Sequence, residues 1–130
     1  ERIFGSPHYV APEQVRGGLI DGRADLYALG ATAWHLLTGK TVFQGSNRQV
    51  VLAHINTEPE DLDKLAPNAN EDLIELIEDL LEKDPDKRPK NATEVVARVD
   101  EILKQPPRAK GAPPRPRMVK RVRRRRRYRS

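Results

Sequence analysis

The chain has 130 residues, which suits one domain of ordinary size, and no cysteine, which excludes a disulfide scaffold and thiolate metal sites. Its net charge of +5 conceals two different parts, because residues 1–104 hold 12 Lys/Arg and all 19 Asp/Glu, whereas residues 105–130 hold 12 Lys/Arg and no acid. This division of charge predicts an acidic globular body followed by a basic tail. No apolar run approaches the roughly 18 residues that a membrane-spanning helix needs.

The body is predicted to be all-α, and its first long helix spans residues 25–38. Asp25 is predicted as the N-cap of this helix, and Gly39 suits the left-handed residue that ends it. Apolar side chains occupy most of its circumference, so we expect the helix to be buried. A shorter helix is predicted at about residues 48–55.

An amphipathic helix is predicted next, with Asn70 as its cap and Asp84-Pro85 as its stop. Its apolar stripe comprises Leu73, Ile74, Ile77, Leu80 and Leu81. The acidic residues on its opposite side, which we expect to stay in water, are Glu75, Glu78, Asp79 and Glu82.

The last helix is predicted to begin after Asn91 and to end before Pro106-Pro107, since Asn91 and Glu94 stand at capping-box spacing. Its apolar stripe comprises Val95, Val96, Val99, Ile102 and Leu103. Residues 105–130 combine five prolines with many cations and have little to bury against the entropy of ordering. We therefore predict a disordered Pro/Arg-rich tail.

Three short motifs follow one another along the body, at residues 5–13, 25–30 and 84–89. The stretch from Gly5 to Glu13 resembles the end of the kinase activation segment, whose pattern is Gly-Thr/Ser-x-x-Tyr-x-Ala-Pro-Glu. Residues 25–30 resemble the Asp-x-Trp-x-x-Gly start of the central helix, with Tyr27 in place of the more usual Trp. Residues 84–89 resemble the Asp-Pro-x-x-Arg-Pro turn between the last two long helices.

Together these motifs make residues 1–104 resemble the end of the activation segment and the helical C-terminal lobe of a bacterial receptor-like serine/threonine kinase. The resemblance implies the helical part of the protein kinase-like fold, which as a whole is α+β. It also implies that the stretch positions the protein substrate through Gly5, Ser6, Pro7, His8 and Tyr9. The Gly5-Ser6 pair with Tyr9 favours the Ser/Thr class over tyrosine kinases, which usually carry Pro and Trp in this stretch.

The resemblance assigns structural roles to three further residues. It implies a buried ion pair between Glu13 and Arg88, which fits an Arg side chain because its planar guanidinium can grip a carboxylate with two hydrogen bonds. It also implies that the Asp25 carboxylate receives backbone amides of the catalytic loop. By contrast, three histidines lie on different elements without metal-ligand spacing, and we interpret all of them as structural: His8, His35 and His54.

The motifs that perform phosphoryl transfer are missing. The 130 residues contain no Gly-x-Gly-x-x-Gly loop, no His-Arg-Asp and no Asp-Phe-Gly, so we expect no catalytic, cofactor or metal site in this chain. ATP and Mg²⁺ are expected for the full-length kinase, of which we interpret the chain as a truncated part. The alternative is a non-catalytic, pseudokinase-like docking or scaffold module.

The cationic run from Lys120 to Arg129 is open to three interpretations. The first is a juxtamembrane segment that contacts an anionic membrane surface. On this interpretation we expect the protein in the cytoplasm, and at the inner face of the plasma membrane if a spanning helix follows Ser130. Nucleic-acid binding through phosphates is the second interpretation, and a solvated charge run is the third. Equally weak binding to anionic vesicles and to DNA at physiological salt would favour the third.

Overall fold

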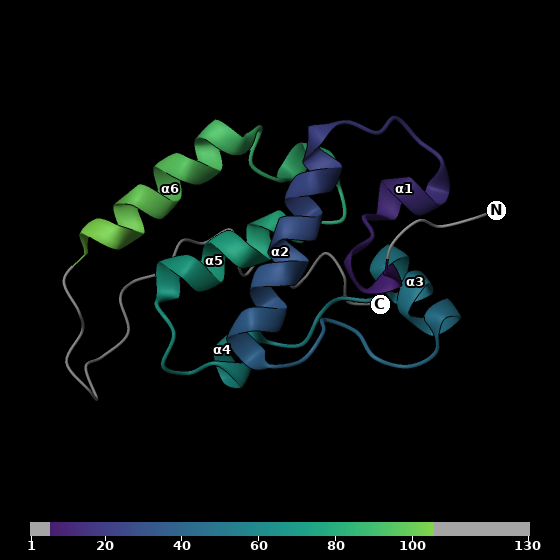
Figure 1. Ribbon diagram of the computed structural model, residues 1–130, viewed down its shortest axis with the longest axis horizontal. Helices are drawn as coiled ribbons and strands as arrows, with labels where there is room; N and C mark the ends of the chain where they lie inside the picture. The colour runs from purple at the N-terminus through teal and green to yellow at the C-terminus, as the bar shows by residue number, and fades with distance from the viewer. Residues whose placement is uncertain (1–5, 106–130) are drawn as a thin grey trace.

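A computed structural model describes residues 6–105, and within that range every regular element is a helix (Figure 1). The elements in chain order are the 3₁₀ turn η1 (Pro7–Tyr9), α1 (Pro12–Arg16), α2 (Gly22–Thr38), α3 (Asn47–Asn56), α4 (Leu62–Leu65), α5 (Glu71–Leu80), the 3₁₀ turn η2 (Pro85–Lys87) and α6 (Ala92–Lys104). The predicted all-α body is confirmed. Gly5 and residues 106–130 lie outside the described residues, so the expectations for the tail stay predictions.

The core lies where α2 crosses α5, with α4 and α6 packed on the other sides of α5 (Figure 1). The larger apolar cluster joins Tyr27 and Trp34 of α2 to Ile74 and Ile77 of α5. A second cluster is formed by Leu26, Leu76, Leu80 and Val95. The two long helices therefore form the base on which the N-terminal segment rests.

Gly30 allows the close approach of α2 and α5. A Cβ atom placed on Gly30 would lie 2.7 Å from Leu80 Cβ and 3.2 Å from Leu81 Cγ, so a side chain fits only if the helices separate. In contrast, a Cβ on Gly22, at the start of the same helix, would meet nothing within 4 Å.

These two glycines give a matched test of helix packing. We expect Gly30→Ala to lower the free energy of unfolding by about 2 kcal/mol, because overpacking outweighs the gain in helix propensity. Gly22→Ala should leave stability unchanged or raise it by up to about 1 kcal/mol. Urea unfolding followed by circular dichroism measures both, and equal effects at the two sites would contradict this account of the packing.

The N-cap of α2 is Asp21 and not Asp25, so that prediction is wrong. Asp21 has extended backbone and its carboxylate accepts from Arg23 N at 2.9 Å, whereas Asp25 lies exposed within the first turn. The helix already begins at Gly22, so Asp25 lies inside its first turn and is not the non-helical residue that caps it. The predicted end at Gly39 is confirmed, because its φ is 81° and its N–H donates to His35 O.

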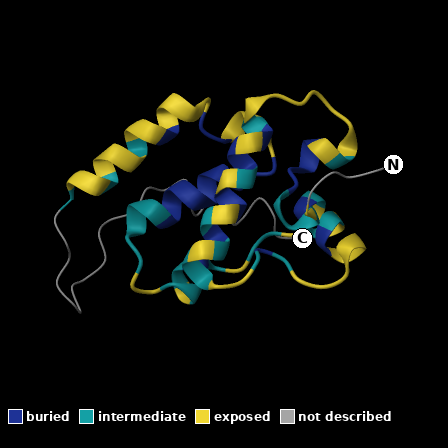
Figure 2. Ribbon diagram, in the orientation of Figure 1, coloured by how far each residue is buried: buried dark blue, intermediate teal, exposed yellow. Residues whose placement is uncertain are grey.

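α2 is buried on one face only, against the expectation of a helix buried all round. Figure 2 shows the banding of buried and exposed residues along it, and Leu29 and Leu36 are 45% and 83% exposed. Four side chains spaced along one line of the helix share this exposure: Asp25, Leu29, Thr32 and Leu36. One face of α2, which carries two leucines, therefore stays uncovered by residues 6–105.

The acidic side of α5 is not in water, contrary to prediction. The four acidic residues predicted for this side are buried, with 5–8% exposure: Glu75, Glu78 and Asp79 of α5, and Glu82. Glu82 lies two residues beyond the end of α5 at Leu80, because the helix stops before the predicted Asp84-Pro85. The reason is tertiary, because α2, α4 and α6 all contact this one helix. Asp79 forms an ion pair with Arg98 of α6 at 2.9 Å, and the other three also have polar or electrostatic partners.

α6 lies at the periphery of the bundle and is mostly exposed (Figure 2). Of its predicted stripe only Val95 is buried and Ile102 partly so, whereas the remaining three residues are exposed: Val96, Val99 and Leu103. Gln105, which the sequence pattern placed in the tail, caps α6 and exchanges hydrogen bonds with Asn70 and Asp72 at the start of α5. The folded body therefore includes residue 105.

Candidate functional site

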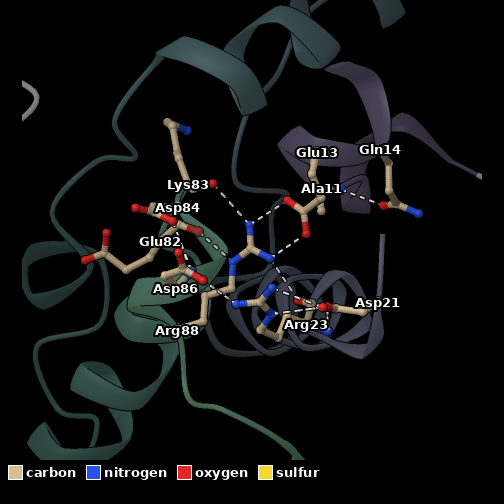
Figure 3. Close-up of polar contacts among 10 residues, drawn as sticks. All are labelled: Ala11, Glu13, Gln14, Asp21, Arg23, Glu82, Lys83, Asp84, Asp86 and Arg88. Carbon is tan, nitrogen blue, oxygen red and sulfur yellow. Dashed lines mark hydrogen bonds and ion pairs between the residues drawn. The ribbon is translucent and has the colours of Figure 1, made fainter. Parts of the chain in front are cut away.

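Glu13 and Arg88, 75 positions apart in sequence, form a buried ion pair with two hydrogen bonds (Figure 3). Arg88 Nη1 donates to Glu13 Oε2 at 2.7 Å, and Nη2 donates to Oε1 at 2.9 Å. The Arg88 side chain is 0% exposed and that of Glu13 is 9% exposed. This is the pair that the kinase resemblance implied, and it joins α1 to the segment after η2.

The guanidinium of Arg88 uses every one of its five N–H groups. Besides the two bonds to Glu13, Nε donates to Glu82 O at 2.7 Å, Nη1 to Arg23 O at 2.9 Å and Nη2 to Lys83 O at 3.3 Å. A buried arginine is stable only when its donors are satisfied in this way. Arg88 thus connects α1, the start of α2 and the end of α5.

The aromatic ring of Tyr27 completes the surroundings of Arg88. The centre of the guanidinium lies 5.0 Å from the ring centroid, within the range of a cation–π contact. Tyr27 itself is fully buried in the main cluster. The residue that replaces the more usual Trp therefore contacts the ion pair directly.

Two opposing effects act on the pKa of Glu13. Burial of the carboxylate favours its neutral form, but hydrogen bonds from Arg88 and from its own backbone amide favour the charged form, as does the positive charge of Arg88. The net result is a pKa below the usual value for Glu. The pair is therefore ionised at neutral pH and carries stability that is lost only under acidic conditions.

Residues 6–10, which we call the 6–10 segment, form an extended strip interrupted by the turn η1. The turn begins at Ser6, whose Oγ accepts from His8 N at 3.3 Å, and Pro7 stands in its first position. Ser6 is exposed, so its hydroxyl lies at the surface. The serine that the sequence singled out is thus both a cap and an accessible polar group.

Two histidines hold the 6–10 segment against the helical base. The hydroxyl of Tyr9 is 2.8 Å from Nδ1 of His35 on α2, and the two rings stack. The backbone oxygen of His8 is 3.0 Å from Nε2 of His54 on α3. Ion pairing at Glu13 and these two contacts together fix the segment over α2 and α3.

The predicted site residues fall into two groups. Ser6, Pro7, His8 and Tyr9 form one continuous segment, and Glu13, which pairs with Arg88, follows in α1. Asp25 is exposed in the first turn of α2 and makes no cap. The motifs did not predict that Tyr27 contacts Arg88 and His54, or that Lys83 binds carbonyl oxygens of α3. These contacts join residues that are far apart in the sequence.

Among residues 6–105, one group of carboxylates is close enough to hold a metal ion. The ligand oxygens of Asp61, Asp63 and Glu78 lie within 4.8 Å of one another. Each of the three also has other polar or electrostatic partners in the protein. Acidic clusters are common without an ion, so we assign no metal to this group.

The fold is that of the helical lobe of a protein kinase. The twitchin kinase region of C. elegans superimposes with a TM-score of 0.65 over 78% of this chain and 18% of that one, at 21% sequence identity. In the sequence, the family model for the protein kinase domain matches residues 1–105. The chain therefore belongs to the protein kinase domain family, and it represents the C-terminal lobe region of that domain.

Curated bacterial relatives are serine/threonine kinases. The chain is 38% identical over 96 residues to the serine/threonine-protein kinase pkn2 of Myxococcus xanthus, covering 72% of this chain and 12% of that protein. It is 34% identical over 96 residues to PrkC of Bacillus subtilis, covering 73% of this chain and 15% of that protein. The chain thus spans less than a sixth of these relatives. Within residues 6–105 no helix is long and apolar enough to cross a membrane.

Proposed function

We propose that this chain is the substrate-positioning lobe of a kinase that transfers phosphate from ATP to Ser or Thr residues of proteins. In this function the 6–10 segment lies beside the acceptor residue, and the helices beneath it hold the segment in place. The alternative is a docking or scaffold module without catalysis. It is less well supported because the contacts of Tyr9, His8 and Glu13 that hold the 6–10 segment and α1 in place are all present.

The observation that carries the proposal is the buried ion pair between Glu13 and Arg88. It joins α1, which directly follows the 6–10 segment, to α2 and to the residues after α5, through all five donors of one guanidinium. A purely structural helical bundle has no need of a buried charge, which costs desolvation energy. A buried ion pair is useful where a segment must keep one conformation beside a substrate, because its hydrogen bonds fix the geometry.

Chemistry requires groups that this chain does not contain. A phosphate-binding loop, a lysine for the phosphates, metal ligands and a base for the acceptor hydroxyl are all needed for transfer. We propose that a longer polypeptide supplies them and binds ATP and Mg²⁺, and that the 130 residues alone are inactive. The cationic run from Lys120 to Arg129 is proposed to attract anionic membrane surfaces, with nucleic acid as the weaker candidate.

A phosphorylation assay tests this function. The purified 130-residue chain, mixed with labelled ATP, Mg²⁺ and a Ser/Thr-containing peptide, is expected to give no labelled peptide. A polypeptide that extends the chain upstream through a glycine-rich loop, His-Arg-Asp and Asp-Phe-Gly is expected to label the peptide. Magnesium-dependent labelling by the 130 residues alone would contradict the proposal, and so would an inactive extended polypeptide that carries all three motifs.

A further inference from the structure

His54 lies between the 6–10 segment and the central helix α2. Its Nε2 is 3.0 Å from the backbone oxygen of His8, and its Nδ1 is 2.6 Å from the hydroxyl of Tyr27. The ring is fully buried, and Phe43 packs edge-on against it with centroids 4.9 Å apart. The imidazole is thus held on both nitrogens and packed against an aromatic ring.

The chemistry of these partners determines which nitrogen carries the proton. A backbone carbonyl only accepts, so Nε2 must donate to His8, and the neutral ring then has Nδ1 free to accept from the Tyr27 hydroxyl. Burial, together with the nearby ammonium of Lys83, lowers the pKa of His54 to about 4, so the ring is neutral at neutral pH. His54 is therefore a donor to the 6–10 segment.

The helix that carries His54 is anchored at the same end. Lys83 Nζ donates to the last carbonyls of α3, at Ala53 and His54, over 3.3 and 3.0 Å. Arg16 Nη2 donates to Ile55 O at 3.2 Å. Cations at a helix C-terminus both satisfy its orphan carbonyls and complement its dipole. The donor on His54 thus has a fixed support.

Tyr27 connects this donor to the ion pair described above. Its ring lies 5.0 Å from the guanidinium of Arg88, and its hydroxyl bonds to His54. A continuous set of contacts therefore leads from Glu13 through Arg88, Tyr27 and His54 to the backbone of His8. Each contact joins a different element of the fold.

We propose that His54 is a positioning residue for the protein substrate, acting through the hydrogen bond from its Nε2 to the His8 carbonyl. This inference rests on the proposed function of the 6–10 segment. The bond sets the path of the backbone at η1, next to the exposed Ser6. Within residues 6–105 the contacts of His54 are to His8, Tyr27, Phe43 and Lys83, so we expect it to affect where the substrate binds and not the chemical step.

The first test uses the 130-residue chain and does not depend on kinase activity. Nitrogen-15 NMR of the imidazole is expected to show a protonated Nε2 and an unprotonated Nδ1 on His54. In His54→Leu the amides of His8 and Tyr9 should exchange with solvent about tenfold faster, as expected for one lost buried hydrogen bond. His54→Gln, whose amide can donate from nearly the same place, should restore slow exchange.

A variant on the same helix gives the control. Leu52→Ala alters a partly exposed side chain of α3 that takes no part in these contacts, and it should leave exchange at His8 and Tyr9 unchanged. A proton on Nδ1 of His54, or equal acceleration of the amides of α5 in His54→Leu, would overturn the inference. The second result would mean that His54 only stabilises the whole fold.

The second test separates the inference from the proposed function. In the extended kinase, His54→Leu should raise the KM for a peptide about tenfold, leave kcat and the KM for ATP unchanged, and be rescued by Gln. A lower kcat with unchanged peptide KM would overturn the positioning role. If the wild-type extended kinase transfers no phosphate, the proposed function fails, while the NMR result still decides whether His54 holds His8.

Discussion

Replacing Arg88 with Met is expected to lower the free energy of unfolding by about 3–5 kcal/mol, the largest effect of any single change considered for this protein. The substitution strands the buried carboxylate of Glu13 and removes donors from three backbone carbonyls, at Arg23, Glu82 and Lys83. Domains of this size are stable by about 5–15 kcal/mol, so much of the folded population is lost. Urea unfolding at neutral pH measures the change, and loss of helical circular dichroism without urea would be the extreme case.

Two comparisons make this prediction specific. Glu13→Gln should also destabilise, but by less than Arg88→Met, because the amide oxygen still accepts one hydrogen bond from Arg88 and the three carbonyl contacts persist, although the amide nitrogen faces an Arg88 donor. Lys64→Met should cost less than about 1 kcal/mol, because Lys64 is exposed and its contact with Asp61 is 3.9 Å long. Equal losses in Arg88→Met and Lys64→Met would contradict a structural role for the buried pair.

Exchanging the two charges in one double variant is expected not to restore stability. A carboxylate at position 88 would face the three carbonyl oxygens that Arg88 now satisfies, and like partial charges repel. Full recovery in Glu13→Arg/Arg88→Glu would show that these carbonyl contacts contribute little. Urea unfolding of the double variant and both single variants decides the point.

The free energy of unfolding is expected to fall by roughly 3 kcal/mol as the pH is lowered from above 6.5 to 4. Burial, with the charge of Lys83, lowers the pKa of His54 from 6.5 to about 4 in the folded state. Between these values the unfolded chain binds a proton that the folded chain excludes, so stability is complete above pH 6.5 and declines as the pH falls. The groups that face the ring are His8, Tyr27, Phe43 and Lys83.

A His54→Gln variant isolates this dependence. It lacks the titrating ring, so its stability should change little between pH 6.5 and 4.5. Below pH 4.5 both proteins should lose further stability, because the pKa of Glu13 is lowered in the folded state and its carboxylate must then be protonated on unfolding. Urea unfolding across this pH range is the measurement, and identical slopes in the two proteins would contradict the assignment to His54.

Local sequence features predicted most of the secondary structure. The caps at Asn70 and Asn91 and the stop at Gly39 act within one turn of chain, where the identity of one side chain decides the hydrogen bond. The start of α2 was misjudged because Asp21 and Asp25 are both able to cap. Only the actual backbone conformation distinguishes them, since Asp21 is extended and Asp25 is helical.

The candidate site could be predicted where a motif carried it. Pairing of Glu13 with Arg88 followed from the resemblance of two distant motifs, and the structure places the two side chains in contact. The other donors and acceptors around Arg88 are backbone carbonyls, which every residue has and which no sequence pattern marks. The contacts from Tyr27 through His54 to His8 were not predictable either, because they join residues 27 and 46 positions apart that belong to no common motif.

Composition and periodicity by themselves determined that the body is acidic and helical and where several of its helices begin or end, because propensity, capping and charge act over a few neighbouring residues. Only the tertiary structure decided which faces are covered. It buries Glu75, Glu78 and Asp79 of α5, leaves Leu36 of α2 exposed and buries His54 among several elements. Burial depends on residues far away in sequence, and so do the pKa of His54 and the position of the 6–10 segment that follow from it.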